Sequence, residues 1–333
     1  MRAIVLDRPG SFRVAEVPDP TPGPDQIVVK VDCCGICGTD IHIMDGEFPP
    51  TPYPITPGHE FAGTVAAVGT DVDAAMHLSV GARVAVDPSV YCGYCKRCRA
   101  GRGNLCENWA AIGDTVDGAF AEYVAVPAAN AYLLPDGFDG QVAAMMEPLA
   151  CAVHGLRRLG PVFGDTVLLT GAGTMGLLLL QLLTHAGAGT VTVVDRVSDR
   201  LEVARKLGAA RVASDIGELA DERFEITVDA TGVPAVIQAG SDLLDRGGRL
   251  LVFGVSPAEA AISLSPFRVY NDEITVTGSM AILRSFAPAV ELLTSGVVDP
   301  RPLLSTPLPL EEFGEALRRV RAGQGIKWHI RPS

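Results

Sequence analysis

The stretch that decides the fold is "DTVLLTGAGTMGLLLLQLLTHAGAGTVTVVD", residues 165–195. It begins with a short apolar run, passes through a glycine-rich turn, continues through a longer apolar segment and ends in a β-branched run. Short apolar runs bounded by glycines are typical of buried strands, whereas the longer segment has the length of a helix. The stretch therefore predicts a strand, a turn, a helix and a second strand parallel to the first.

The same alternation continues toward the C-terminus. The pattern predicts helices over 199–209 and 234–245, and strands over 225–231, 248–255 and 273–280. Strands that alternate with helices build a doubly wound parallel sheet with helices on both faces. From about residue 150 onward we therefore expect an α/β domain of the Rossmann type.

Residues 1–150 have a different character, rich in Gly, Pro and short β-branched runs. "QIVVKVDCC" (26–34), "FAGTVAAVG" (61–69) and "ARVAVDP" (82–88) predict strands of a mostly antiparallel, irregular β domain. The prolines between residues 18 and 24 indicate an extended connection. Residues 284–333 predict two helices and a closing strand, and a chain of 333 residues is long enough for two cores.

Bulk properties exclude several classes of function. The net charge of -12 argues against a nucleic-acid partner, because phosphate binding requires a basic surface. The N-terminus has no apolar secretory core, and the longest apolar run, Gly176–Leu183, is too short to span a membrane, so we expect a cytoplasmic protein with no membrane partner. In a reducing compartment the eight cysteines indicate metal ligands or catalytic thiols rather than disulfides.

The glycine turn predicts a dinucleotide site. Gly171, Gly173 and Gly176 form a GxGxxG pattern directly after a strand, which lets the backbone approach a pyrophosphate at the N-terminus of the following helix. The alternative is a turn required only for packing. The residues expected to bind the cofactor are Gly171, Gly173, Thr174, Met175, Gly176, Asp195 and Arg196.

Asp195 and Arg196, at the end of the next strand, bear on the choice of cofactor. A carboxylate at this position can bind the ribose diol of NAD and repels the additional phosphate of NADP. An adjacent arginine can accept that phosphate. We expect NAD, with NADP as the less favoured alternative.

The segment "CGYCKRCRAGRGNLC" predicts a structural metal site. Its four cysteines, Cys92, Cys95, Cys98 and Cys106, can close a tetrahedral shell around Zn²⁺ and leave no position for a substrate. An iron–sulfur cluster can use similar spacings and is the alternative. The basic side chains of the same loop can offset the negative charge of the thiolates.

A second set of candidate ligands is spread along the chain. "GICGTDIH" contains Cys37, "TPGHEFAG" places His59 beside Glu60, and "MMEPLACAVHG" contains Glu147. One thiolate, one imidazole and one or two carboxylates would make an open zinc site of the catalytic type. Together with the four-cysteine loop, this predicts two zinc ions per chain.

These motifs occur in the order found in a known family. The chain resembles the zinc-containing medium-chain alcohol dehydrogenases, and within them the polyol (sorbitol-like) branch. The resemblance covers nearly the whole chain. It implies a GroES-like catalytic domain formed by residues 1–147 and 284–333, a Rossmann NAD-binding domain over 148–283, and a homodimer or homotetramer.

The resemblance also assigns roles to individual residues. It implies that Cys37, His59 and Glu60 hold the catalytic zinc, and that Glu147 ligates it directly, through water or by exchange as the substrate enters. It implies further that Thr39 accepts the proton of the substrate, that His42 passes it toward solvent, and that Asp40 orients a zinc-bound imidazole.

The expected reaction is the reversible oxidation of a secondary alcohol, such as a polyol or sugar alcohol, to a ketone. A zinc ion at such a site lowers the pKa of the substrate hydroxyl, and hydride passes from the substrate carbon to NAD. Three alternatives remain open: an L-threonine 3-dehydrogenase or another secondary alcohol dehydrogenase, a zinc-free reductase of the same superfamily, and a non-catalytic zinc protein that senses NAD. The zinc-free reductase would lack Cys37, the His-Glu pair and the four-cysteine loop.

Cys34 and Cys37 form a CxxC pattern, but only Cys37 is predicted to be a zinc ligand. Cys37→Ala should abolish activity because it removes a zinc ligand, whereas Cys34→Ala should leave two zincs per chain and most of the turnover. Metal analysis and the rate of NAD reduction would measure both effects. Equal damage to the metal site by both substitutions would contradict this interpretation.

Overall fold

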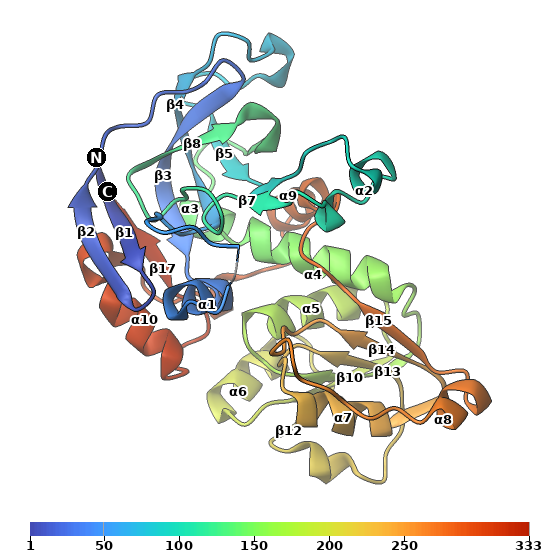
Figure 1. Cartoon of the computed structure of the whole chain (residues 1–333). Helices are drawn as coiled ribbons and strands as arrows, with labels where there is room; N and C mark the ends of the chain where they lie inside the picture. The colour runs from blue at the N-terminus through green and yellow to red at the C-terminus, as the bar shows by residue number, and fades with distance from the viewer. Residues whose placement is uncertain (49, 333) are drawn as a thin grey trace. The chain divides into compact units, whose positions relative to one another are not determined.

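The computed structural model describes residues 1–48 and 50–332 and divides the chain into two compact units (Figure 1). The first unit consists of Met1–Pro148 and Ile282–Ser333, and the second of Leu149–Ala281. The boundaries expected from the sequence differ from these by one and two residues. The fold class, a β-rich domain joined to a doubly wound α/β domain, is confirmed.

The second unit contains a parallel sheet with the strand order β12-β11-β10-β13-β14-β15. Its strands are β10 (Thr166–Thr170), β11 (Thr190–Val194), β12 (Arg211–Ala213), β13 (Phe224–Asp229), β14 (Leu244–Val252) and β15 (Thr275–Gly278). Its helices are α5 (Thr174–His185), α6 (Ser198–Lys206), α7 (Pro234–Asp242) and α8 (Pro266–Asn271), while α4 (Met146–Leu159) contains the unit boundary. Right-handed crossovers place α5 and α6 on one face and α7 on the other, which Figure 1 shows for α5 and α7.

The strand order reverses between β10 and β13, and the glycine turn lies at this point. β10 is the most buried part of the sheet, since Val167, Leu168 and Leu169 are fully covered. The chain leaves β10 at its carboxyl end through Gly171 and enters α5 at Thr174. In doubly wound sheets, ligands bind outside the carboxyl ends of the strands at this reversal.

The first unit is built on a sheet with the strand order β16-β17-β3-β4-β5-β9, in which β8 also pairs with β3. Its strands are β1 (Arg2–Arg8), β2 (Ser11–Glu16), β3 (Gln26–Gly35), β4 (Glu60–Val68), β5 (Arg83–Val86), β6 (Ser89–Val90), β7 (Ala110–Ala111), β8 (Tyr123–Pro127), β9 (Ala131–Leu133), β16 (Leu308–Pro309) and β17 (His329–Arg331). Its helices are α1 (Gly38–Asp45), α2 (Lys96–Arg99), α3 (Gly140–Ala143), α9 (Phe286–Thr294) and α10 (Phe313–Arg321). Apart from the short β16–β17 pair, the paired strands of this sheet are antiparallel, as expected.

The three N-terminal strand predictions match β3, β4 and β5, but other elements were missed. The hairpin of β1 and β2 precedes the proline-rich connection, and α1 follows β3 after a short turn. β14 begins at Leu244, four residues before Gly248, where the expected strand started. Glycines weaken the sequence pattern of a strand, so the first residues of β14 were not recognised. In the structure, Leu244 pairs with Phe224 of β13.

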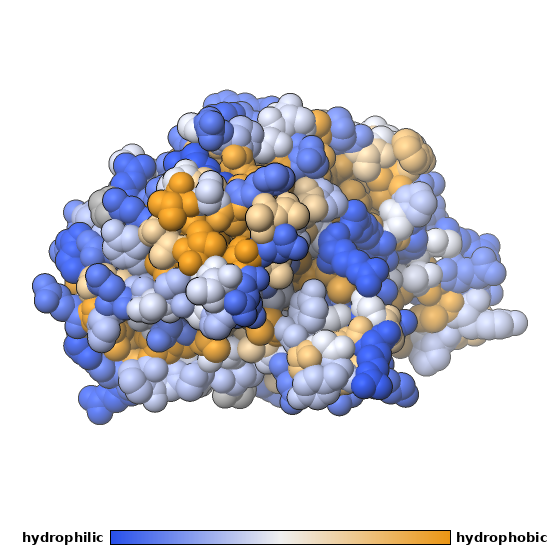
Figure 2. All heavy atoms as spheres, turned by 90° about the horizontal axis from the view of Figure 1, so that it is seen from above, coloured by the Kyte–Doolittle hydropathy of each residue, from blue (hydrophilic) through white to orange (hydrophobic). Residues whose placement is uncertain are grey.

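Surface and core follow the usual distribution. The face drawn in Figure 2 mixes hydrophilic and hydrophobic side chains. A large hydrophobic cluster in the core of the first unit includes Ile4, Cys34, Phe61, Phe120 and Phe313. Within the described residues, no helix has the length and apolar composition needed to cross a bilayer.

The glycines of the turn differ in the space around them. A Cβ at Gly176 would collide with the backbone oxygen of Gly171, whereas a Cβ at Gly173 would meet no atom within 4 Å. Gly171 has a φ of 95°, which favours glycine. Gly171 and Gly176 are therefore required by the fold itself, and Gly173 leaves its space open to a ligand.

We therefore predict that alanine at Gly176 affects stability, whereas alanine at Gly173 affects NAD binding. Gly176→Ala should lower the free energy of unfolding by about 1–3 kcal/mol, because the added methyl group overpacks the turn. Gly173→Ala should leave stability nearly unchanged but weaken NAD binding at least tenfold. Thermal unfolding and fluorescence titration with NADH would measure the two effects, and unchanged affinity in Gly173→Ala would argue against a pyrophosphate at this turn.

Candidate metal and nucleotide sites

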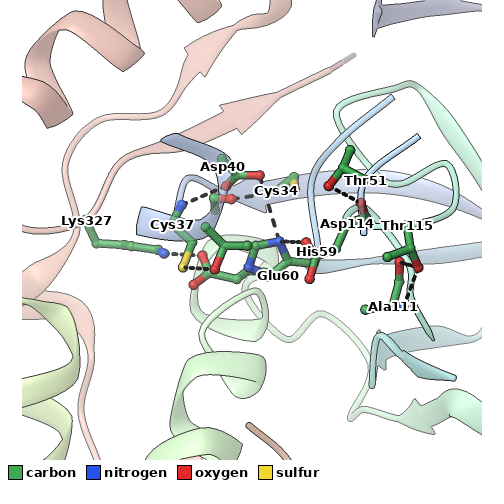
Figure 3. Close-up of polar contacts among 12 residues, drawn as sticks. Cys34, Cys37, Asp40, Thr51, His59, Glu60, Ala111, Asp114, Thr115 and Lys327 are labelled. Atoms are coloured by element: carbon green, nitrogen blue, oxygen red, sulfur yellow. Dashed lines mark hydrogen bonds and ion pairs between the residues drawn. The ribbon is translucent and has the colours of Figure 1, made fainter. Parts of the chain in front are cut away.

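Three potential metal ligands converge in the first unit (Figure 3). One ligand atom from each of Cys37, His59 and Glu60 lies within 4.8 Å of the other two. The pairing of β3 with β4 explains this convergence, since Gly35 lies opposite Glu60. Cys37 follows the end of β3 and His59 precedes the start of β4, so antiparallel pairing brings the two motifs together.

The donor atoms suit a zinc ion of the catalytic type. His59 and Glu60 are 5% and 1% exposed, and Cys37 is half-buried. A thiolate, an imidazole and a carboxylate are the ligand types that Zn²⁺ accepts. Glu147 is buried in the first turn of α4, but its carboxylate is not part of the converging set found among the described residues.

Lys327 is part of this site and was missed by the sequence analysis. Its buried ammonium forms an ion pair with Glu60 and donates a hydrogen bond to the backbone oxygen of Ile36 (3.0 Å). Although burial would lower the pKa of Lys327, the negative charges of Glu60 and Cys37 raise it. The available signal was a lysine within the apolar run "IKWHI".

Gly35 makes room for this ion pair. A Cβ at this position would collide with the Glu60 carboxylate and lie 2.8 Å from Lys327 Cε. A buried carboxylate is tolerated when a cation and further hydrogen bonds accompany it. The glycine of "CCGIC" is therefore needed for the approach of two charged side chains.

The residues expected to move the proton extend from Cys37 along α1. The Thr39 hydroxyl lies 3.7 Å from the Cys37 sulfur and accepts its weak hydrogen bond. His42 is exposed, and its Nδ1 lies 2.8 Å from the carboxylate of Glu47, a partner the sequence analysis did not consider. Thr39 thus lies beside a candidate ligand, while His42 lies at the surface.

The imidazole of His59 faces two carboxylates. Its Nδ1 is 2.9 Å from Asp114 Oδ1 and 3.8 Å from Asp40 Oδ1. Burial opposes a positive charge on this ring, but Asp114 and Asp40 hold the pKa of His59 well above its ordinary value. Burial raises the pKa of Asp40 to about 7. The sequence analysis expected Asp40 here and missed Asp114, which is much closer.

The four-cysteine loop has the geometry of a closed metal shell. A tetrahedron with Zn–S bonds of about 2.3 Å has sulfur–sulfur edges of about 3.8 Å. The Cys106–Cys92, Cys95–Cys106 and Cys92–Cys98 sulfur distances are 3.5, 3.9 and 4.0 Å. Backbone N–H groups of Cys95 and Cys98 point at sulfur atoms within the loop, each at 3.4 Å. The residues present therefore fit a tetrahedral metal ion.

In the second unit the glycine turn is tied to the end of β11. The Asp195 carboxylate accepts hydrogen bonds from the backbone N–H of Ala172 (2.7 Å) and of Val197 (2.8 Å). Thr174 and Met175 form the start of α5, and Arg196 is exposed. Asp195 therefore lies at the glycine turn, as the spacing in the sequence predicts.

Comparison with protein families gives two matches. Residues 23–136 match the model of the alcohol dehydrogenase GroES-like domain. Residues 174–295 match the model of the zinc-binding dehydrogenase domain. The two matches lie in the first unit and mainly in the second unit, respectively.

Several characterised proteins are similar over nearly the whole chain. D-arabinitol dehydrogenase 1 of Uromyces fabae is 35% identical, with 100% of this chain and 97% of that protein covered. D-altritol 5-dehydrogenase of Agrobacterium fabrum is 37% identical, with 94% of both chains covered. L-threonine 3-dehydrogenase of Aeromonas hydrophila is 33% identical, also with 94% of both covered.

Solved structures agree with the whole fold. A zinc-binding dehydrogenase of Sinorhizobium meliloti bound to NADP has a TM-score of 0.95 at 35% identity, with 99% of both chains covered. An alcohol dehydrogenase of Escherichia coli complexed with NADH has a TM-score of 0.92 at 31% identity, with 100% of this chain and 99% of that one covered. The chain belongs to the zinc-dependent medium-chain alcohol dehydrogenases, in their polyol dehydrogenase branch, and is an oxidoreductase that uses zinc and a nicotinamide cofactor.

Proposed function

We propose that this enzyme oxidises a secondary alcohol of a polyol or sugar alcohol to the ketone, reversibly, with NAD as the hydride acceptor. The observation that carries the proposal is the convergence of Cys37, His59 and Glu60, with the Thr39 hydroxyl 3.7 Å from the Cys37 sulfur. The substrate loses a hydride from carbon and a proton from oxygen. Bound NAD would supply the hydride acceptor, and the Thr39 hydroxyl takes the substrate proton as it releases its own toward solvent.

In this proposal, one set of residues binds zinc and another transfers the proton. Cys37, His59 and Glu60, with Glu147 as a fourth or exchanging ligand, would hold a zinc ion, which would supply Lewis acidity toward the substrate oxygen. Thr39 accepts the hydroxyl proton. His42, at the surface beside Glu47, passes that proton to solvent.

The polyol class is favoured by the relatives named for D-arabinitol and D-altritol. The second candidate is oxidation of L-threonine at C3 or of another secondary alcohol, because a relative named for L-threonine has nearly the same identity. A non-catalytic NAD-sensing protein is least favoured. It would have no need of a hydroxyl beside the ligand set.

We propose NAD in preference to NADP. Asp195 places a carboxylate beside the turn, where it would repel a 2′-phosphate. Arg196 and the NADP bound in the Sinorhizobium neighbour support the alternative. We also propose two zinc ions per chain, one in each ligand set, and a cytoplasmic protein, because a reducing compartment keeps clustered thiols such as those of Cys92, Cys95, Cys98 and Cys106 available as metal ligands.

A homo-oligomer is also proposed, through the outer edge of the second unit's sheet. β15 pairs only with β14 among the described strands and therefore presents unpaired backbone groups. Val276 on β15 is 44% exposed, and Phe267 and Tyr270 on the preceding helix α8 are 71% and 83% exposed. A second copy related by a two-fold axis could pair with this edge and cover these side chains.

The oligomer proposal predicts the effect of a charge at this edge. Val276→Glu should halve the native mass, because two-fold pairing would bring two carboxylates together. Val80, which is 68% exposed in the first unit, offers the control Val80→Glu, which should leave the mass unchanged. Analytical ultracentrifugation would measure both. A monomeric wild-type chain would contradict the proposal.

A substrate panel tests the function itself. Purified enzyme should reduce NAD with polyols such as D-arabinitol at kcat/KM values at least tenfold above those for L-threonine and simple secondary alcohols. Absorbance of NADH at equal enzyme concentrations would measure this. A preference for L-threonine would support the second candidate, and no turnover on any alcohol by a chain carrying two zincs would overturn the proposal.

A further inference from the structure

The His59 imidazole has two acidic neighbours, but they are not equivalent. Asp114 Oδ1 forms an ion pair with Nδ1 at 2.9 Å, although neither atom makes a hydrogen bond of regular geometry in the structure, whereas Asp40 Oδ1 lies 3.8 Å away. Figure 3 shows the two side chains approaching the ring from different directions. The distance alone favours Asp114 as the acceptor for this nitrogen.

Asp40 is engaged elsewhere. Its Oδ2 accepts the backbone N–H of Cys37 at 2.8 Å, which completes the capping box at the start of α1. This contact orients Asp40 toward the backbone of Cys37. Asp40 therefore supports the thiol ligand and the helix that begins beside it.

Asp114 is held by its own loop, between β7 and β8. It is 6% exposed, and its backbone oxygen accepts a hydrogen bond from the Thr51 hydroxyl at 2.8 Å. The loop closes on itself through Gly113 N–H to Val116 O, at 2.8 Å. A side chain on such a loop has little freedom to move away from its partner.

The same loop forms hydrogen bonds with the segment that precedes His59. Asp117 accepts the backbone N–H of Thr56 at 2.8 Å, and the N–H of Ala119 donates to Gly58 O at 2.8 Å. A Cβ at Gly113 would collide with the Gly58 oxygen. These backbone contacts set the position of Asp114 relative to His59 independently of any ligand.

We propose that Asp114 is the positioning residue that accepts Nδ1–H of His59 and leaves Nε2 as the nitrogen that binds zinc. A carboxylate in this place fixes the tautomer and the ring orientation and raises the basicity of the ligand nitrogen. The inference rests on the proposed zinc site. It concerns metal affinity, so it can be tested apart from turnover.

The test is zinc retention in four variants of the full chain: Asp114→Ala, Asp114→Asn, Asp117→Asn and Asp40→Asn. Loss of such a carboxylate typically costs 10–100-fold in metal affinity. Asp114→Ala should therefore release one zinc to a chromophoric chelator 10–100 times faster than the wild type, and Asp114→Asn, which keeps an acceptor oxygen, less than that. The second zinc, in the four-cysteine loop, serves as a reference within each molecule.

The other variants distinguish the loss of a carboxylate beside His59 from the loss of a negative charge elsewhere in the loop. Asp117→Asn removes the same charge from the same loop but keeps an oxygen that can accept the N–H of Thr56, so the loop should stay anchored and zinc should be released at the wild-type rate. The visible spectrum of the Co²⁺-substituted enzyme should change in Asp114→Ala and stay unchanged in Asp117→Asn, and circular dichroism would confirm that each variant is folded.

The outcomes distinguish this inference from the proposed function. Wild-type zinc release in a folded Asp114→Ala, or a larger effect in Asp40→Asn than in Asp114→Asn, would overturn the role of Asp114 alone. A wild-type chain that holds two zincs but oxidises no alcohol would overturn the proposed function and leave this inference standing. A wild-type chain without zinc at Cys37 and His59 would overturn both.

Discussion

The register of three strands at Gly35 is the constraint on which the catalytic half of the molecule depends. β3 pairs with β4 so that Gly35 lies opposite Glu60, and with β17 so that Gly35 lies opposite His329. Cys37, Glu60 and Lys327 are thereby brought to one end of the sheet from distant parts of the chain. Because a slip of one residue would turn every side chain to the opposite face, the site and the core of this unit are specified together.

The glycine at the centre of this register has a chemical consequence. Without a Cβ at Gly35, the Glu60 carboxylate and the Lys327 ammonium can meet inside the protein. Removing one partner of a buried pair is strongly destabilising, because the other charge then remains uncompensated. The ion pair therefore ties the C-terminal segment to the candidate metal-binding motif, in addition to the pairing of β17 with β3.

Sequence patterns predicted what local chemistry determines and missed what pairing between distant segments determines. The glycine turn, the four-cysteine loop and the candidate ligands Cys37, His59 and Glu60 were predicted because short motifs carry them. Lys327 and Asp114 were missed, since nothing near either residue shows which strand or loop it will face. Glu147 was singled out from the sequence as a candidate carboxylate and given its role by the resemblance, but it lies outside the set that converges in the structure, so its role as a ligand stays a prediction.

The excess of acidic groups around His59 favours the binding of a divalent cation. Cys37, Asp40, Glu60 and Asp114 bring four acidic groups into a small, largely buried region, in which Lys327 pairs with Glu60 and His59 with Asp114. Such an excess is costly in a medium of low dielectric constant, and the pKa of Asp40, raised by burial to about 7, reflects that cost. A divalent cation bound by Cys37 and His59 would reduce the excess, so the acidic neighbours that weaken the metal-free protein are those that strengthen metal binding.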